Sequence, residues 1–230
     1  SEKLDFKLKF RADNRYPDMD ETNPFVSFVD AQSVTAGNPF LKPQVTHKIS
    51  MQVDILGGLL TLEPYYHFSD NYITQTGMLR SDTVFQYSYS NAGSYVRYGS
   101  EARFTIPMGK SFFLQTDADV FSNSITYAGT TNKFNYWVMS SQLIYQNSKY
   151  NTVAGLKYQK NLTRNITAQG YDKGDNDCWL AFVQQPFFKE KLNVMLLYFI
   201  PIDAGVDFNQ GSYVKTATYK ETKEYDISIL

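Results

Sequence analysis

A chain of 230 residues with 43% hydrophobic side chains is long enough to bury a core, and its formal net charge is −1. This near-neutral balance gives no general electrostatic attraction to nucleic acid or to an anionic bilayer. A single cysteine, Cys178, excludes an intrachain disulfide and a thiolate metal centre, and no run of about 18 apolar residues predicts a membrane-spanning helix.

The elements predicted in chain order are all strands. Leu4, Phe6, Leu8 and Phe10 alternate with charged residues, and a period of two indicates a strand. The same alternation predicts further strands near residues 49–55, 60–68, 94–106, 112–120, 133–146, 152–161, 177–186, 191–200 and 212–227. About ten strands result, and most reach the roughly 9–11 residues that a tilted transmembrane strand needs.

The connections between these strands are predicted to alternate in length. Tight joints are expected at Gly57-Gly58, Pro107 to Lys110, Asn147 to Asn151 and Pro186 to Lys191. Longer polar connections are expected at Ala12 to Gln44, Gln75 to Asp82, Thr126 to Asn132, Leu162 to Asn176 and Pro201 to Gly211. Antiparallel strands joined in this way have their short turns at one end, as outer-membrane β-barrels do.

The fold predicted is therefore all-β, an antiparallel up-and-down meander that forms part of a larger transmembrane β-barrel. Aromatic residues near the strand ends, such as Tyr65, Tyr66 and Phe68, are typical of membrane interfaces. A soluble sandwich or small barrel alternates in the same way with its apolar face inward, and it remains the alternative. In the membrane interpretation Arg97, Glu101, Arg103, Asp117 and Asp119 point into the lumen.

Signals for catalysis or metal binding are sparse. His67 and Glu63 share a strand face, as do Asp117 and Asp119, but a lumen-lining role is favoured over a metal site or an acid pair for both. The sequence therefore predicts no enzyme, no metal and no cofactor. Weak ligand-binding candidates are Asp172, Asp175, Asp177 and Trp179, in and just after a predicted outer loop, where function commonly collects.

Two segments resemble a known family. Residues Asn23 to Asp30 read Asn-Pro-Phe-Val-Ser-Phe-Val-Asp, and Gly37 to Gln44 read Gly-Asn-Pro-Phe-Leu-Lys-Pro-Gln. The second is similar to the segment G-N-P-x-L-K-P-E that precedes a barrel strand in TonB-dependent outer-membrane receptors, with Gln44 in place of Glu. The fuller run resembles the Bacteroidetes type, the outer membrane protein β-barrel family, and Phe187 to Val194 resembles its penultimate periplasmic turn and the following strand.

This resemblance implies a bacterial outer-membrane receptor that imports a scarce solute, such as an iron chelate, cobalamin, a glycan or a peptide, with energy delivered through TonB. Such receptors have 22 strands and an N-terminal plug, so residues 1–230 are expected to be one C-terminal segment of a barrel without a plug domain. Outer-membrane lipid, the solute, and TonB through a missing N-terminal part are the partners implied. Open sheet edges also predict self-association, and the alternative is a self-contained small β-barrel or sandwich that binds an apolar ligand or a protein partner.

Overall fold

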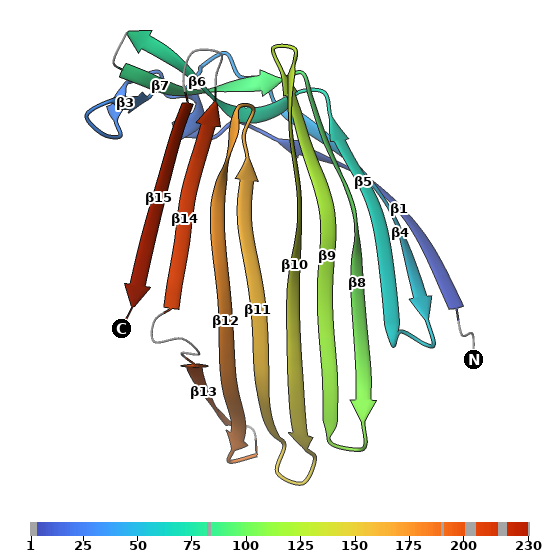
Figure 1. The fold of residues 1–230 in the computed structure, drawn as a ribbon. Helices are drawn as coiled ribbons and strands as arrows, with labels where there is room; N and C mark the ends of the chain where they lie inside the picture. Colours follow the sequence, from blue (N-terminus) through green and yellow to red (C-terminus); the bar gives the residue numbers. More distant parts are fainter. Residues whose placement is uncertain (1–3, 82–83, 190, 201–205, 216–219, 230) are drawn as a thin grey trace.

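The described residues form two sheets, a long antiparallel one and a small one across its end (Figure 1). The computed structural model describes residues 4–81, 84–189, 191–200, 206–215 and 220–229. The long sheet, here called the wall, contains β1 (Leu4–Arg15), β4 (Gln44–Ile55), β5 (Leu60–Ser69), β8 (Ser94–Met108), β9 (Phe112–Tyr127), β10 (Thr130–Asn147), β11 (Thr152–Ile166), β12 (Gly170–Phe187), β13 (Leu192–Ile200), β14 (Val206–Lys215) and β15 (Lys220–Ile229). In this described part, no helix is long and apolar enough to cross a membrane.

The strand order of the wall is a meander. It runs β1-β4-β5-β8-β9-β10-β11-β12-β14-β15, and β13 pairs with β12 beside this path. β13 and β14 pair with different parts of the same edge of β12, because β11 occupies the other edge. The predicted all-β antiparallel fold and the count of about ten strands are confirmed, and β1 and β15 stand at the two ends of the order.

The predicted tight joints all lie at one end of the wall, the lower end in Figure 1. Gly57 and Gly58, between β4 and β5, have φ angles of 71° and 89°, and Gly109, between β8 and β9, has 75°. Glycine adopts these positive angles without the steric cost of a Cβ atom. The turn residues therefore allow neighbouring wall strands to reverse within a few residues.

Several of the predicted long connections are wrong. The stretch Thr126 to Asn132 is a hairpin closed by Ala128 and Gly129, and Leu162 to Asn176 is mostly strand, because β11 ends at Ile166 and β12 begins at Gly170. Gln75 to Ser81 lies in strand β6. At the C-terminal end, β14 covers Val206 to Gly211 of the predicted Pro201 to Gly211 loop, and residues 201–205 lie outside the described residues. The single strand predicted at 212–227 is divided between β14 and β15.

Two connections fold into the second sheet, here called the lid. The first connection, between β1 and β4, contains the short helix α1 (Met19–Thr22), β2 (Ser27–Phe28) and β3 (Ser33–Thr35). Between β5 and β8 the chain forms the hairpin of β6 (Tyr72–Ser81) and β7 (Val84–Ala92). β3 pairs in parallel with β7, which gives the order β2-β3-β7-β6, and this sheet lies across the end of the wall opposite the tight turns (Figure 1).

The two faces of the wall differ in chemistry. On one face cross-strand neighbours are apolar, as in the pairs Leu8–Met51 and Val120–Trp137, and Leu8 is 76% and Val120 63% exposed. The opposite face carries charged residues, such as Arg103 and Asp117, and the lid packs against one end of this face. We call these the outer and inner faces.

A small core joins the lid to the wall. Ile125 of β9, Tyr95 of β8 and Ala92 of β7 pack with Ala168 of the β11–β12 turn. Thr74 Oγ1 accepts a hydrogen bond from the Ala168 backbone N–H at 3.1 Å, and Gln169 Oε1 accepts one from the Gly77 N–H at 2.6 Å. The turn that replaces the predicted long loop thus holds the lid in place.

Candidate functional site

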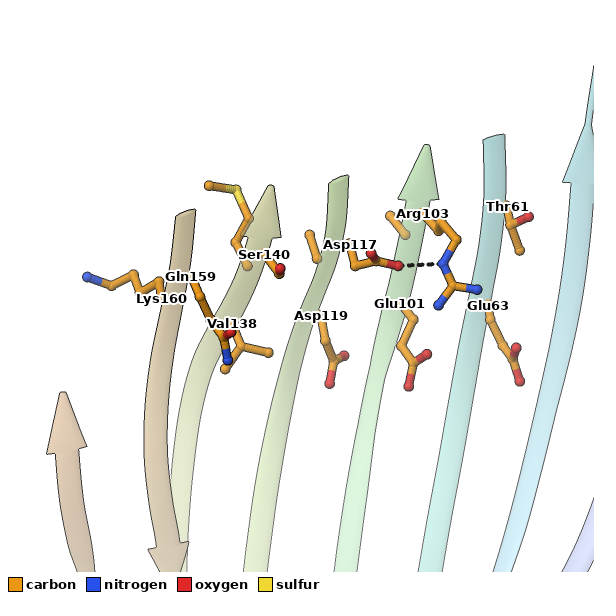
Figure 2. A pocket seen from close by; sticks show the side chains of 13 residues that line it. Thr61, Glu63, Glu101, Arg103, Asp117, Asp119, Val138, Ser140, Gln159 and Lys160 are labelled. Carbon is orange, nitrogen blue, oxygen red and sulfur yellow. Dashed lines mark hydrogen bonds and ion pairs between the residues drawn. The ribbon is translucent and has the colours of Figure 1, made fainter. Parts of the chain in front are cut away.

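Ionised side chains line the inner face of the wall at mid-height. Cross-strand registers place Glu63 of β5 beside Glu101 of β8, and Glu101 beside Asp119 of β9. With Arg103 and Asp117 they border a shallow cavity of about 280 Å³ (Figure 2). All five residues predicted to point into a lumen, Arg97, Glu101, Arg103, Asp117 and Asp119, alternate onto this inner face.

Most of these charges are paired with each other. Arg97 Nη2 lies 3.0 Å from Asp119 Oδ2, and Asp119 also accepts a hydrogen bond from the Tyr65 hydroxyl at 2.9 Å. Arg103 pairs with Asp117, as the dashed line in Figure 2 shows. Asp117 and Asp119 thus have separate arginine partners, an arrangement that does not favour an acid pair.

The two histidines pack against aromatic rings. His67 stacks on Tyr65 at 4.7 Å between ring centroids, and His47 stacks on Phe68 at 5.0 Å. Glu63, the suggested partner of His67, instead lies 2.9 Å from Lys9 Nζ and accepts a hydrogen bond from Ser50 at 2.7 Å. Among the described residues no group of three or more His, Cys, Asp or Glu side chains is placed to hold a metal ion.

A second and larger cavity, of about 560 Å³, lies where the lid meets the inner face. We call it the outer cavity. Four tyrosines line it: Tyr72 of β6, Tyr89 of β7, Tyr95 of β8 and Tyr136 of β10. Lid and wall therefore both contribute rings, and the cavity exists only because two connections far apart in the sequence fold over the sheet.

The charges at the outer cavity are neutralised within the protein. Arg15 lies 2.5 Å from Glu21, which is buried, and Arg97 is held by Asp119. Burial raises the pKa of the Tyr72 hydroxyl, and burial together with Glu21 raises that of Tyr89. Tyr72 and Tyr89 are accordingly neutral hydroxyls at physiological pH.

One polar atom at the outer cavity has no partner. Asn123 of β9 lines the cavity and is only 6% exposed. Its Nδ2 donates to the Tyr136 hydroxyl at 3.1 Å, and its Oδ1 has no hydrogen-bond partner. A buried acceptor without a partner costs about 1–3 kcal/mol, so this amide lowers the stability of the fold beside the cavity.

The residues suggested as ligand-binding candidates lie elsewhere. Asp172, Asp175 and Asp177 are on strand β12 and not in a loop, and their side chains lie outside the described residues. Trp179 follows on the same strand, where it pairs in register with Tyr158 and contacts its ring at 5.0 Å. Trp179 faces outward with the apolar rows, away from both cavities. The outer cavity, which the sequence did not predict, is the stronger candidate.

The fold and the site together define a class. Long antiparallel strands with an apolar outer face, a charged inner face and tight turns at one end are the features of a transmembrane β-barrel wall. The model of the outer membrane protein beta-barrel family matches residues 1–223. The chain belongs to this family, and its location is the bacterial outer membrane. No curated protein and no solved structure matches the chain.

Proposed function

We propose that this chain forms part of the barrel wall and outer lid of a TonB-dependent outer-membrane receptor of the Bacteroidetes type, which actively imports a scarce solute. The observation that carries the proposal is the outer cavity, which lies between the charged inner face and a lid made from two outer connections. A solute arriving from outside meets the lid first, and the polar face below it suits a hydrated passage.

The open strand order supports a larger assembly. β1 and β15 end the order of the wall, so each offers an edge to which further strands can be added. In our proposal such strands complete a barrel in outer-membrane lipid, and TonB acts through a segment outside residues 1–230. A small barrel with an apolar interior is less well supported, because the apolar rows are on the outer face and the inner face is charged.

The proposal assigns the chain no enzymatic activity and no nucleic-acid partner. Its two histidines are packed against aromatic rings, and its acidic residues Asp117 and Asp119 are paired with arginines. A formal net charge of −1 gives no general attraction to a polyanion.

Uptake in the native host tests this proposal. Cells with the gene deleted should lose high-affinity uptake of at least one solute from the class of iron chelates, cobalamin, glycans and peptides. Collapsing the inner-membrane proton gradient with an uncoupler should abolish the same uptake in cells that carry the gene. Uptake that needs the gene but resists the uncoupler would identify a passive channel and overturn the proposal.

A further inference from the structure

We propose that Lys133 and Lys160 bind the phosphate groups of anionic lipid headgroups on the outer face of the wall, at its lid end. Such a site goes beyond the general contact of the outer face with hydrocarbon, because it selects one kind of headgroup, and it is independent of the imported solute. Three features of the wall support it: the distribution of charge between its faces, the level at which the lysines lie, and the rings that their ammonium groups contact.

Charged side chains are distributed unequally between the two faces. Among the side chains that the structure describes in β1, β4, β5 and β8 to β13, Lys133 and Lys160 are the only lysine, arginine, aspartate or glutamate residues in the outward rows. Lys133 is four residues before Trp137 on β10, so both face outward. Lys160 of β11 pairs with Met139, two residues after Trp137, and faces outward as well. In Figure 2 its side chain points away from Asp119 of the inner face.

Tyr98 and Trp137 mark the outer boundary of the hydrocarbon layer. The tight turns are the periplasmic end of the wall, and the lid lies at the opposite end (Figure 1). A tilted strand crosses the hydrocarbon in about 9–11 residues. Counted from the tight turns, this length ends near Tyr98 on β8 and near Trp137 on β10, since these strands end at Met108 and Asn147. Both rings are 45% exposed, as expected of aromatic residues at a membrane interface.

Each ammonium group lies over one of these two rings. Lys133 Nζ is 5.7 Å from the centroid of the Tyr98 ring and donates a hydrogen bond to its hydroxyl at 3.2 Å. Lys160 Nζ is 5.5 Å from the centroid of the Trp137 ring. A cation over an aromatic face is attracted by the ring, so the two rings hold the ammonium groups at the level of the headgroups.

Phosphate is the anion that headgroups offer at this level. A lysine that faces lipid is strongly destabilising at the bilayer midplane but nearly neutral at the interface, where basic residues attract anionic lipids. Tyr98 of β8 and Asn135 of β10 both pair in register with Ser122 of β9. Trp137 is the next outward residue after Asn135, so the two rings are neighbours across β9. Both cations can therefore act on one small patch of headgroups.

Fluorescence quenching by lipids with brominated acyl chains tests the site. The reporter is the full 230-residue chain with Trp179→Phe, which leaves Trp137 as the only tryptophan. In liposomes, Trp137 should be quenched more by brominated phosphatidylglycerol than by brominated phosphatidylcholine. We expect Lys133→Gln and Lys160→Gln each to lower this preference about fivefold, the effect of one interfacial cation, and Lys133→Arg to keep it. The lysines are changed separately because the side chain of Asp177, the register partner of Lys160 on β12, lies outside the described residues.

Lys149→Gln is the matched control, because Lys149 Nζ lies 5.1 Å from the centroid of the Tyr150 ring in the tight turn after β10. It repeats the pairing of lysine and ring at the opposite end of the wall and should leave the preference at Trp137 unchanged within about twofold. Equal quenching by the two lipids, or a preference that neither lysine substitution lowers, would overturn the inference. A preference abolished by millimolar inorganic phosphate would identify a site for free phosphate and would overturn it as well. None of these outcomes bears on uncoupler-sensitive uptake, so the proposed function is tested independently.

Discussion

The wall and the lid use apolar residues in opposite ways. On the wall the apolar rows face outward, and residues such as Leu8 and Val120 are largely exposed. Within the lid hairpin and where the lid packs on the wall, apolar residues are enclosed, as Phe85 of β7, 1% exposed, and Ile125 of β9, fully buried, show. The wall therefore depends on lipid to cover its apolar face, whereas the lid is stabilised by packing as a water-soluble protein is. Substitutions in the two environments should therefore change stability in different ways.

The largest effect is expected in the lid. Phe85→Ala removes a fully buried ring and should lower the stability of the lid by about 3–5 kcal/mol, the usual cost of such a cavity. Hydrogen exchange of the amides in residues 72–92 should accelerate while the amides of β9 and β10 keep their protection. Phe28→Ala, at a lid residue that is 85% exposed, is the control and should change little. Equal acceleration in lid and wall would show that they unfold as one unit.

A charge on the outer face should give the next largest effect. Leu143 lies on β10 beside Leu114, and Leu143→Lys should destabilise the wall in a bilayer by about 2–4 kcal/mol if the residue lies near the bilayer midplane. Ser140→Lys, on the inner face that borders the mid-height cavity, is the matched control and should cost about 1 kcal/mol or less. Urea titrations in liposomes, followed by tryptophan fluorescence, measure both. Equal losses would mean that the outer face does not contact lipid.

The different surroundings of the wall and the lid explain which strands could be predicted from the sequence. Period-two alternation located the wall strands because one face meets lipid and the other meets polar groups. The same signal fails in β6, where neighbouring Ile73 and Thr74 are both buried, because both faces of this strand are covered. The hairpin at Ala128 and Gly129 was missed since its turn lacks the usual Asn-Gly pair, although both residues have the positive φ angles that a type I′ turn requires.

The outer cavity was harder to predict than the strands. Its four tyrosines come from β6, β7, β8 and β10, and no local motif links them. Asn123 sits in an ordinary alternating segment of β9, and only the fold shows that its amide is buried with one acceptor unpartnered. The five charged residues of the inner face were predictable because strand alternation alone assigns them to one side.

A crowding substitution should have an intermediate effect confined to the lid. A Cβ atom on Gly77 would lie 2.2 Å from the Phe85 ring, so Gly77→Ala should cost about 1–3 kcal/mol through overpacking. If the contact is responsible, adding Phe85→Leu to Gly77→Ala should cost less than the sum of the two single changes. Protease sensitivity of the lid measures this coupling. Strict additivity would place the strain somewhere other than the Phe85 ring.

The smallest effect is expected where wall and cavity meet, at Arg97. Its guanidinium lies 3.8 Å from the centroid of the Phe121 ring and also pairs with Asp119, so planarity matters as well as charge. Arg97→Lys keeps the charge but loses the stacked plane, and should cost about 0.5–1 kcal/mol in urea titrations. Arg103→Lys, at a more exposed pair with Asp117, should have no measurable cost. Equal losses of stability from Arg97→Lys and Arg103→Lys would mean that Arg97 contributes through its charge alone. The ion pairs beside the lid and at mid-height would then contribute equally little to the stability of the wall.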